Sequence, residues 1–396
     1  MTGGGAASVP DRLSGGRLRY HARPVHTRPA SCRVAPISVE AMRDRAEPTF
    51  AGLSAGGRDE PCEVTSNALD AARLVDGFGV DVAATLAWAV DVGRSAPHIG
   101  QGGTGEVWEL LASTAARSVS AARMLEPHLD ALSILGQAGT DAAAVGADIH
   151  SSWGVFAAEG PDVRVTAARQ GESWTLTGTK PWCSLANDLS HALVTAWIDD
   201  SHRQLFAVDL RSDGVRPRRD GWAARGLPQV ISQPVDFDGA LAVAVGDGEW
   251  YLSRPGFAWG GMSVAACWWG AAVGLAAAVG RPASLSTADQ LAHVHLGRVD
   301  AALWGARAVL REAASLIDSG GSVAVGERLL AARVRAVVVD AATLTIAEAD
   351  AALGPAPLVA DPEHAARVSD LHLYLRQHHG LRDVAKLGQS VAAGAR

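Results

Sequence analysis

Two adjacent histidines, His378 and His379, stand in the segment LRQHHGLRD and are the residues best suited to acid–base chemistry. A neutral imidazole has a pKa of about 6.5, so it can take or give a proton close to neutral pH. A structural interpretation is equally open: both side chains end a helix and interact with its C-terminal dipole, worth about 0.3 to 1 kcal/mol. His378 is therefore a candidate base, with the structural role as its alternative.

Thiol and metal chemistry have less support. The four cysteines, Cys32, Cys62, Cys183 and Cys267, lack the C-x-x-C spacing of zinc or disulfide frameworks. His293 and His295 are two positions apart, so on a helix they point to different faces and are a poor metal pair. We therefore expect no metal site and a location in the reducing cytoplasm.

Composition restricts the class of protein. The chain has 396 residues, 48% of them hydrophobic and 19% charged, which predicts a globular protein with two or three domains. The net charge of -7 without a basic stripe argues against a nucleic-acid partner. Residues 255–280 carry no charge, but their many Gly and Ala residues favour a buried helix over a membrane span.

The periodicity of apolar residues divides the chain into four parts. Residues 1–62 are rich in Gly, Pro and Arg and read as a flexible tail. Steps of three and four residues predict a helical domain over 63–148. Alternation with period two predicts a β domain over 149–252, including a hairpin that turns at Gln170 and Gly171. Long helical patterns return over 253–396.

Several motifs occur in this order: WTLTGTKPWCSLAND, WAARG, VDFDG and RPGFAWGG. From about Ser66 to its end, the chain resembles the acyl-CoA dehydrogenase family, which carries a G-x-K-x-W-x-[ST] signature. The resemblance implies an α+β multidomain fold with an N-terminal helical domain, a middle β-sandwich or barrel, and a C-terminal four-helix bundle.

The resemblance also implies a flavin in the middle domain. The signature places Trp182 against the isoalloxazine ring and the Ser184 hydroxyl near the redox nitrogen of the flavin. The alternative is that Trp182, one of 12 tryptophans, fills a sheet face while Ser184 caps a turn. A second flavin segment of the family, F-x-x-[ST]-E-P, matches WGVFAAEGP and implies pocket positions at Val155, Phe156, Ala157 and Ala158. Ala158 replaces the family's hydroxyl, so only backbone contacts are expected there.

The adenosine half of FAD is held in the family partly by the neighbouring subunit. The matching segment here, GRPASLSTADQ, retains Arg281 and Gln290 but lacks the family's Phe-Gly pair. The later Q-x-x-G-G-x-G motif is replaced by ADAALGPAPL. Arg281 and Gln290 are thus the residues that the resemblance assigns to the distal part of FAD.

The family's catalytic Glu is absent from both of its known locations. Alignment on Arg367 and Asp370 puts His378 at one of them, and the other falls near Ser263 or Val264. Removal of an α-proton needs a base, so the resemblance assigns that role to His378.

Three functions follow from the resemblance. The first is FAD-dependent α,β-dehydrogenation of an acyl-CoA or related acyl thioester. The second is a flavin-dependent monooxygenase of the same fold, and the third is a catalytically degenerate subunit that pairs with a complete homologue. In each case the apolar bundle helices predict a homo- or hetero-oligomer.

Overall fold

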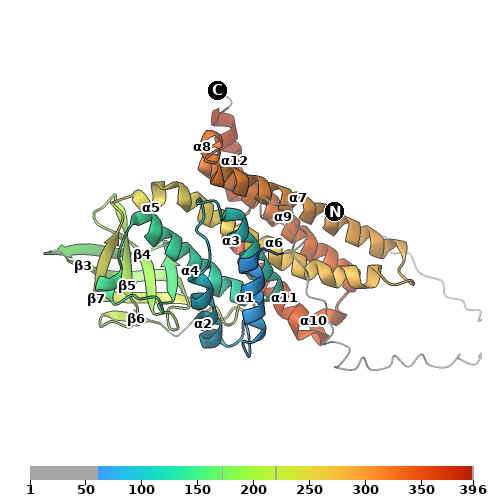
Figure 1. Cartoon of the computed structure of the whole chain (residues 1–396), viewed down its shortest axis with the longest axis horizontal. Helices are drawn as coiled ribbons and strands as arrows, with labels where there is room; N and C mark the ends of the chain where they lie inside the picture. The colour runs from blue at the N-terminus through green and yellow to red at the C-terminus, as the bar shows by residue number, and fades with distance from the viewer. Residues whose placement is uncertain (1–60, 172, 219–220, 395–396) are drawn as a thin grey trace, which may run out of the picture. The chain divides into compact units, whose positions relative to one another are not determined.

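The computed structural model describes residues 61–171, 173–218 and 221–394, all within one compact unit (Figure 1). The tail expected over residues 1–62 lies, apart from its last two residues, outside the described part. Helices come first, strands follow and helices return, which confirms the predicted α+β class. The domain limits expected near residues 148 and 252 stay predictions.

The first helices are α1 (Glu63–Arg73), α2 (Val82–Gly93), α3 (Thr104–Arg117) and α4 (Val119–Ala138), followed by the short 3-10 helix η2 (Ala143–Val145). α2 begins after Asp81, whose carboxylate accepts a hydrogen bond from the Ala84 amide at 3.0 Å. Almost every residue of α3 is buried, because α3 lies between α4 and the C-terminal helices. α4 carries Pro127 in its interior and ends at Gly139, whose φ of 61° forms a left-handed cap.

The middle of the chain forms one sheet. Its strands are β1 (Trp153–Phe156), β2 (Val165–Gln170), β3 (Ser173–Ser184), β4 (His191–Trp197), β5 (Arg203–Asp209), β6 (Val215–Pro217) and β7 (Ser232–Val245). The sheet order is β1-β4-β2-β3-β7-β5, and an additional pairing joins β4 to β5. That pairing closes β2, β3, β7, β5 and β4 into a small barrel, one of the two predicted forms. The predicted hairpin is present, with Gln170 opposite Ser173.

The C-terminal helices follow the barrel. They are α5 (Trp250–Ser253), α6 (Pro255–Ala283), α7 (Gln290–Asp318), α8 (Ser322–Val325), α9 (Glu327–Leu353), α10 (Ala356–Ala360), α11 (Pro362–Tyr374), the 3-10 helix η3 (Leu375–Gln377) and α12 (Leu381–Gly394). α6 packs against α3, α7, α9 and α11, so it forms the centre of the bundle. In Figure 1, α7, α9, α10 and α11 lie to the right of α4, away from the barrel, whereas α5 lies beside the barrel.

α6 is the one helix in the described residues that is long and apolar enough to cross a membrane, and 67% of its most apolar window is buried. Its glycines permit close packing against α3. A Cβ atom at Gly270 would overlap the carbonyl oxygen of Ala112, and one at Gly274 would come within 2.6 Å of that of Ala116. The helix therefore uses its small residues as the sequence predicts, inside the protein.

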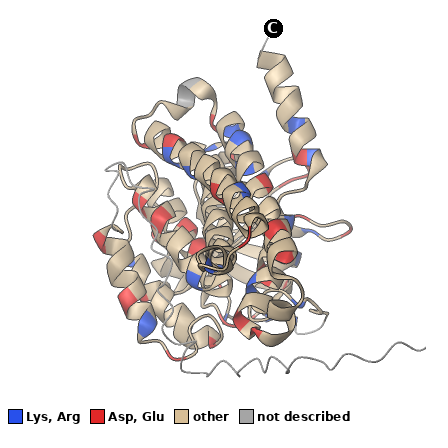
Figure 2. Ribbon diagram, turned by 90° about the vertical axis from the view of Figure 1, so that its right-hand side faces the viewer, with Lys and Arg blue, Asp and Glu red and all other residues tan. Residues whose placement is uncertain are grey.

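Charged residues are dispersed along the described chain. In Figure 2, Lys and Arg are interspersed with Asp and Glu on the helices, without a continuous basic stripe. The helix α12 stands apart from its neighbours in this view and has no buried residue. Its inner side nevertheless borders the pocket described next.

Candidate active site

The signature strand β3 turns Trp182 outward. The register between β3 and β7 shifts between Lys180 and Cys183, which marks a bulge at this point of the strand. Trp182 adopts a left-handed backbone with a φ of 59° and leaves 62% of its surface exposed. A large aromatic residue is rarely found in this conformation, and such residues cluster at functional sites. The indole is thus available to a planar ligand rather than filling a sheet face.

Lys180, two residues before Trp182, bonds the signature segment to neighbouring parts of the barrel. Its buried Nζ donates to Oε1 of Glu159 at 2.7 Å and to the carbonyl and hydroxyl oxygens of Thr195 at 2.9 and 2.8 Å. Burial lowers the pKa of Lys180, against the opposing effect of Glu159. Burial would raise the pKa of Glu159, but the hydrogen bond and charge of Lys180 outweigh it and the pKa is lowered. The ion pair therefore joins the loop after β1 to strands β3 and β4.

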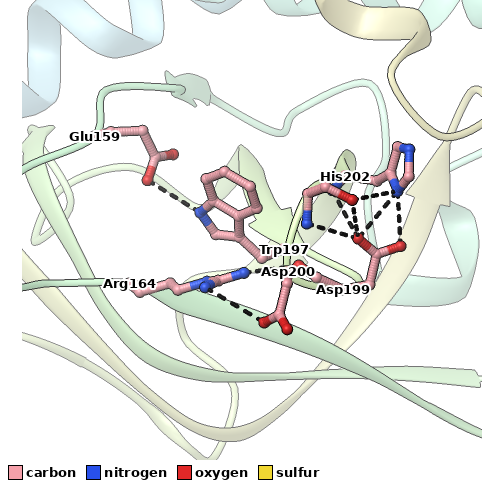
Figure 3. Close-up of polar contacts among 7 residues, drawn as sticks. Glu159, Arg164, Trp197, Asp199, Asp200 and His202 are labelled. Atoms are coloured by element: carbon pink, nitrogen blue, oxygen red, sulfur yellow. Dashed lines mark hydrogen bonds and ion pairs between the residues drawn. The ribbon is translucent and has the colours of Figure 1, made fainter.

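Glu159 has a second set of partners at the barrel surface. Trp197 Nε1 donates to its Oε2 at 3.4 Å, as Figure 3 shows. The guanidinium groups of Arg164 and Arg203 lie 4.3 and 5.0 Å from the Trp197 ring centroid. In the following turn, Asp199 accepts hydrogen bonds from the backbone and ring of His202 (Figure 3). The contacts of Trp197 and of the two arginines surround Glu159, the outer member of the ion pair with Lys180.

Ser184 ends β3 beside a small cavity. Its hydroxyl is 2.7 Å from that of Ser232, and Arg123 Nη2 makes a long hydrogen bond to it at 3.5 Å. Val155 and Phe156 of β1 line the same cavity, whose volume is about 30 Å³. The structure thus brings Ser184 together with the segment that the resemblance assigned to the flavin.

A larger pocket of about 870 Å³ adjoins this cavity, with Arg123, Pro127 and Val155 in the walls of both. Ala157 and Ala158 also line it, and His378 and His379 line it from the C-terminal segment. Val264 of α6, at one of the two places where the family carries its Glu, borders the pocket too. Predicted positions from β1, α6 and the C-terminal segment therefore meet at one cavity.

Several charged side chains in the pocket wall are buried. On α4, Glu126 Oε2 accepts from Arg123 Nη1 at 2.6 Å, and both side chains are less than 10% exposed. One turn later, Asp130 lies 3.8 Å from the guanidinium of Arg254, which is also buried. Burial raises the pKa of Glu126 to about 7 and raises that of Asp130. A carboxyl group with such a pKa can exchange protons near neutral pH.

His378 lies against an aromatic wall. The Trp268 ring meets its ring edge to face, with centroids 6.4 Å apart. The Gly380 amide donates to Nδ1 of His378 at 3.2 Å. Burial lowers the pKa of His378, so the imidazole is neutral at neutral pH. The contacts of His379 are different, because its side chain pairs with Asp383 at 3.3 Å on the more exposed side.

Arg281 and Gln290 are not part of this pocket. Both are exposed, Arg281 near the end of α6 and Gln290 at the start of α7. Arg281 is 17 residues after Val264, about 26 Å along a helix with a rise of about 1.5 Å per residue. Within this chain the structure does not bring them to the residues assigned to the flavin ring.

Sequence reasoning missed Arg123, Glu126 and Asp130. Their spacing of three and four residues puts them on one face of α4, in a helix that is otherwise mainly apolar. Pro127 in the same stretch removes one backbone donor from the helix interior. The sequence signal that could have pointed to these residues was therefore a row of charged residues beside a proline in a helix that is otherwise mainly apolar.

Solved structures were compared with this architecture. KijD3, in complex with FMN and dTDP-3-amino-2,3,6-trideoxy-4-keto-3-methyl-D-glucose, is similar at a TM-score of 0.70 and 17% identity, over 88% of this chain and 97% of that one. Butyryl-CoA dehydrogenase from Megasphaera elsdenii is similar at a TM-score of 0.70 and 14% identity, over 83% of this chain and 98% of that one. The chain has the acyl-CoA dehydrogenase fold.

The dibenzothiophene monooxygenase TdsC from Paenibacillus sp. A11-2 shares the fold as well. Its FMN-bound form is similar at a TM-score of 0.66 and 18% identity, over 82% of this chain and 95% of that one. No family model and no curated protein sequence matches the chain. The fold expected from the motifs is confirmed, while the chemistry has to be argued from the site.

Proposed function

We propose that the protein is a flavin-dependent oxidoreductase whose flavin ring lies against Trp182 and beside Ser184 and whose substrate occupies the large pocket. The observation that carries the proposal is the exposed indole of Trp182, held in a strained backbone at the edge of the barrel. A flavin would supply two-electron redox chemistry there. The large pocket shares Arg123, Pro127 and Val155 with the cavity beside Ser184, and its size of about 870 Å³ lies within the usual range for small-molecule sites.

FAD is the flavin that the resemblance implies, and its adenosine half would require Arg281 and Gln290 of a second copy of the chain. KijD3 and TdsC have been solved with FMN, which has no adenosine half to hold. The comparison of Arg281→Ala with the unaltered protein separates the two cofactors. Weaker FAD binding with unchanged FMN binding would support FAD held across an interface, and unchanged binding of both would exclude that role for Arg281.

The lining combines an apolar surface with one charged region. Glu126, Asp130, Arg123, Arg254 and Arg335 all border the pocket, and a substrate with a polar group can hydrogen-bond to them where a purely aliphatic chain cannot. We therefore put oxidation of a polar substrate first. Dehydrogenation of an acyl thioester is the second candidate, and the presence of His378 in the pocket, at a position that the resemblance gives to the base, favours it.

Visible absorbance of the purified protein, with and without added FMN or FAD, tests the flavin. Anaerobic bleaching of bound flavin by butyryl-CoA would support acyl-thioester dehydrogenation. Oxygen uptake driven by NADH, without bleaching by butyryl-CoA, would support the oxygen-using alternative. A protein that binds neither flavin would contradict the proposal and favour a degenerate subunit that pairs with a complete homologue.

A further inference from the structure

Glu126 lines the large pocket and has one carboxylate oxygen without a hydrogen-bond partner among the described residues. Its Oε2 is engaged by Arg123 at 2.6 Å, whereas Oε1 has no hydrogen-bond partner among the described residues. The side chain is 8% exposed, and the residue lines the large pocket from α4. A carboxyl group held at one oxygen and open at the other is oriented for proton exchange with a bound molecule.

The surroundings of Glu126 keep its two protonation states close in free energy. Burial favours the neutral acid, and so does Asp130 one helical turn away. Arg123 and, from α9, Arg335 favour the carboxylate. The other titratable groups that face Glu126 are Tyr251 of α5, Cys267 of α6 and Tyr374 of α11. These groups are neutral at neutral pH, because burial raises the pKa of each of them.

His378 is arranged for the opposite role. Nδ1 accepts the Gly380 amide hydrogen, so in the neutral ring the proton resides on Nε2. The lone pair of Nδ1 is already occupied, and Nε2 has only a hydrogen to offer. A neutral His378 in this tautomer can donate a hydrogen bond to a substrate but has no free lone pair with which to accept a proton.

We propose that Glu126 is the proton acceptor of this pocket and that His378 is its hydrogen-bond donor, an inference that rests on the proposed flavin function. A flavin bound beside the pocket would supply the two-electron acceptor, and Oε1 of Glu126 would take the proton that the substrate gives up. The substrate would then have lost two electrons and two hydrogens, one to each acceptor, and gained a double bond. The Nε2 hydrogen of His378 stabilises negative charge on the substrate as its proton leaves.

The first test measures protonation directly, without a substrate. The full-length protein is labelled with ¹³C at the side-chain carboxyl of glutamate, and the resonance of Glu126 is assigned as the one that Glu126→Gln removes. If Glu126→Gln disturbs folding, Glu126→Asp provides the assignment instead. We expect this resonance to titrate near neutral pH, with and without flavin. Nitrogen NMR should place the His378 proton on Nε2. A Glu126 that is already ionised in mild acid, or a His378 proton on Nδ1, would overturn the inference.

The second test uses the flavin-loaded protein and butyryl-CoA as the reductant. Glu126→Gln should slow flavin reduction by about 100- to 10,000-fold with flavin affinity unchanged. His378→Gln, which retains a donor, should reduce the rate less than His378→Ala. Glu109→Gln is the matched control, because Glu109 is a buried carboxyl on α3 that does not line the pocket. Full activity of Glu126→Gln would refute the assignment.

The two proposals fail in different ways. Absence of flavin binding would remove the proposed function, whatever the titration shows. Bound flavin together with an ordinary acidic titration of Glu126 would remove only the assignment of the proton acceptor. If butyryl-CoA leaves the flavin oxidised, the acyl-thioester candidate fails, and the NMR titration alone decides between Glu126 and His378.

Discussion

Replacement of Trp182 by Ala separates ligand binding from folding. The residue leaves 62% of its surface exposed, so truncation removes few packing contacts in the folded protein. Trp and Ala meet the same backbone restriction at a φ of 59°, so the substitution leaves the strain unchanged. We expect the free energy of unfolding to change by less than about 0.5 kcal/mol, the usual range for exposed positions.

The effect on flavin binding should be larger. A tryptophan offers about 200 Å² of surface, of which an exposed fraction of 62% leaves roughly 120 Å², and a stacked ring would cover about half of that. At about 25 cal/mol per Å² this burial is worth about 1.5 kcal/mol. Stacking adds about 0.5 to 1.5 kcal/mol. The total of about 2 to 3 kcal/mol corresponds to a roughly 30- to 150-fold rise in the dissociation constant.

Titration of flavin fluorescence at constant ionic strength measures this change for FMN and FAD. Trp304→Ala is the matched control, because Trp304 is 67% exposed but lies on α7. The control should bind FMN like the unaltered protein, because FMN has no adenosine half for a second copy of the chain to hold. An unchanged dissociation constant in Trp182→Ala, with the control also unchanged, would refute the placement of the flavin against this indole.

Three further predictions concern stability and assembly. Glu159→Ala should lower the free energy of unfolding, measured with urea, by about 1 to 3 kcal/mol, because Lys180 loses its counterion. Adding Lys180→Met should recover part of this loss, and an equal loss in the single and the double variant would contradict the prediction. The pKa of Glu126 is raised from 4.5 to about 7, so its stabilising contribution is complete below 4.5 and is lost as pH rises through 7. Urea midpoints should therefore fall more between pH values of about 5 and 8 in the unaltered protein than in Glu126→Gln, and parallel profiles would argue against the shift. The exposed Leu291 and Trp304 of α7 predict an oligomer, and light scattering should show that Trp304→Glu weakens it. If the unaltered protein is a monomer, the predicted oligomer is excluded.

The fold was largely predictable because it follows from local patterns. Alternating apolar residues specified the strands of the barrel, and Gly171, with a φ of 66°, supplies the turn of the predicted hairpin. The charge-free stretch became the buried helix α6, as its glycines indicated. Closure of the barrel through β4 and β5 was less accessible, since it depends on pairing between strands rather than on the pattern within one.

The candidate site was only partly predictable. The positions of Trp182 and Ser184 came from the resemblance, and the structure places Ser184 beside Val155. The contribution of α4 was missed, because Glu126 and His378 are separated by more than 250 residues and meet only through packing of the bundle. The tautomer of His378 depends on the Gly380 amide, a backbone contact that residue types do not reveal.

The ion pair between Lys180 and Glu159 has an evolutionary consequence. A chain that loses the acid first must hold an unpaired ammonium group inside the barrel, and one that loses the lysine first leaves three oxygen acceptors without their shared donor. Either single change is costlier than the joint one, so the two positions should be inherited as a unit. Among homologous sequences, a lysine at the first position and an acid at the second should accordingly be present or absent together.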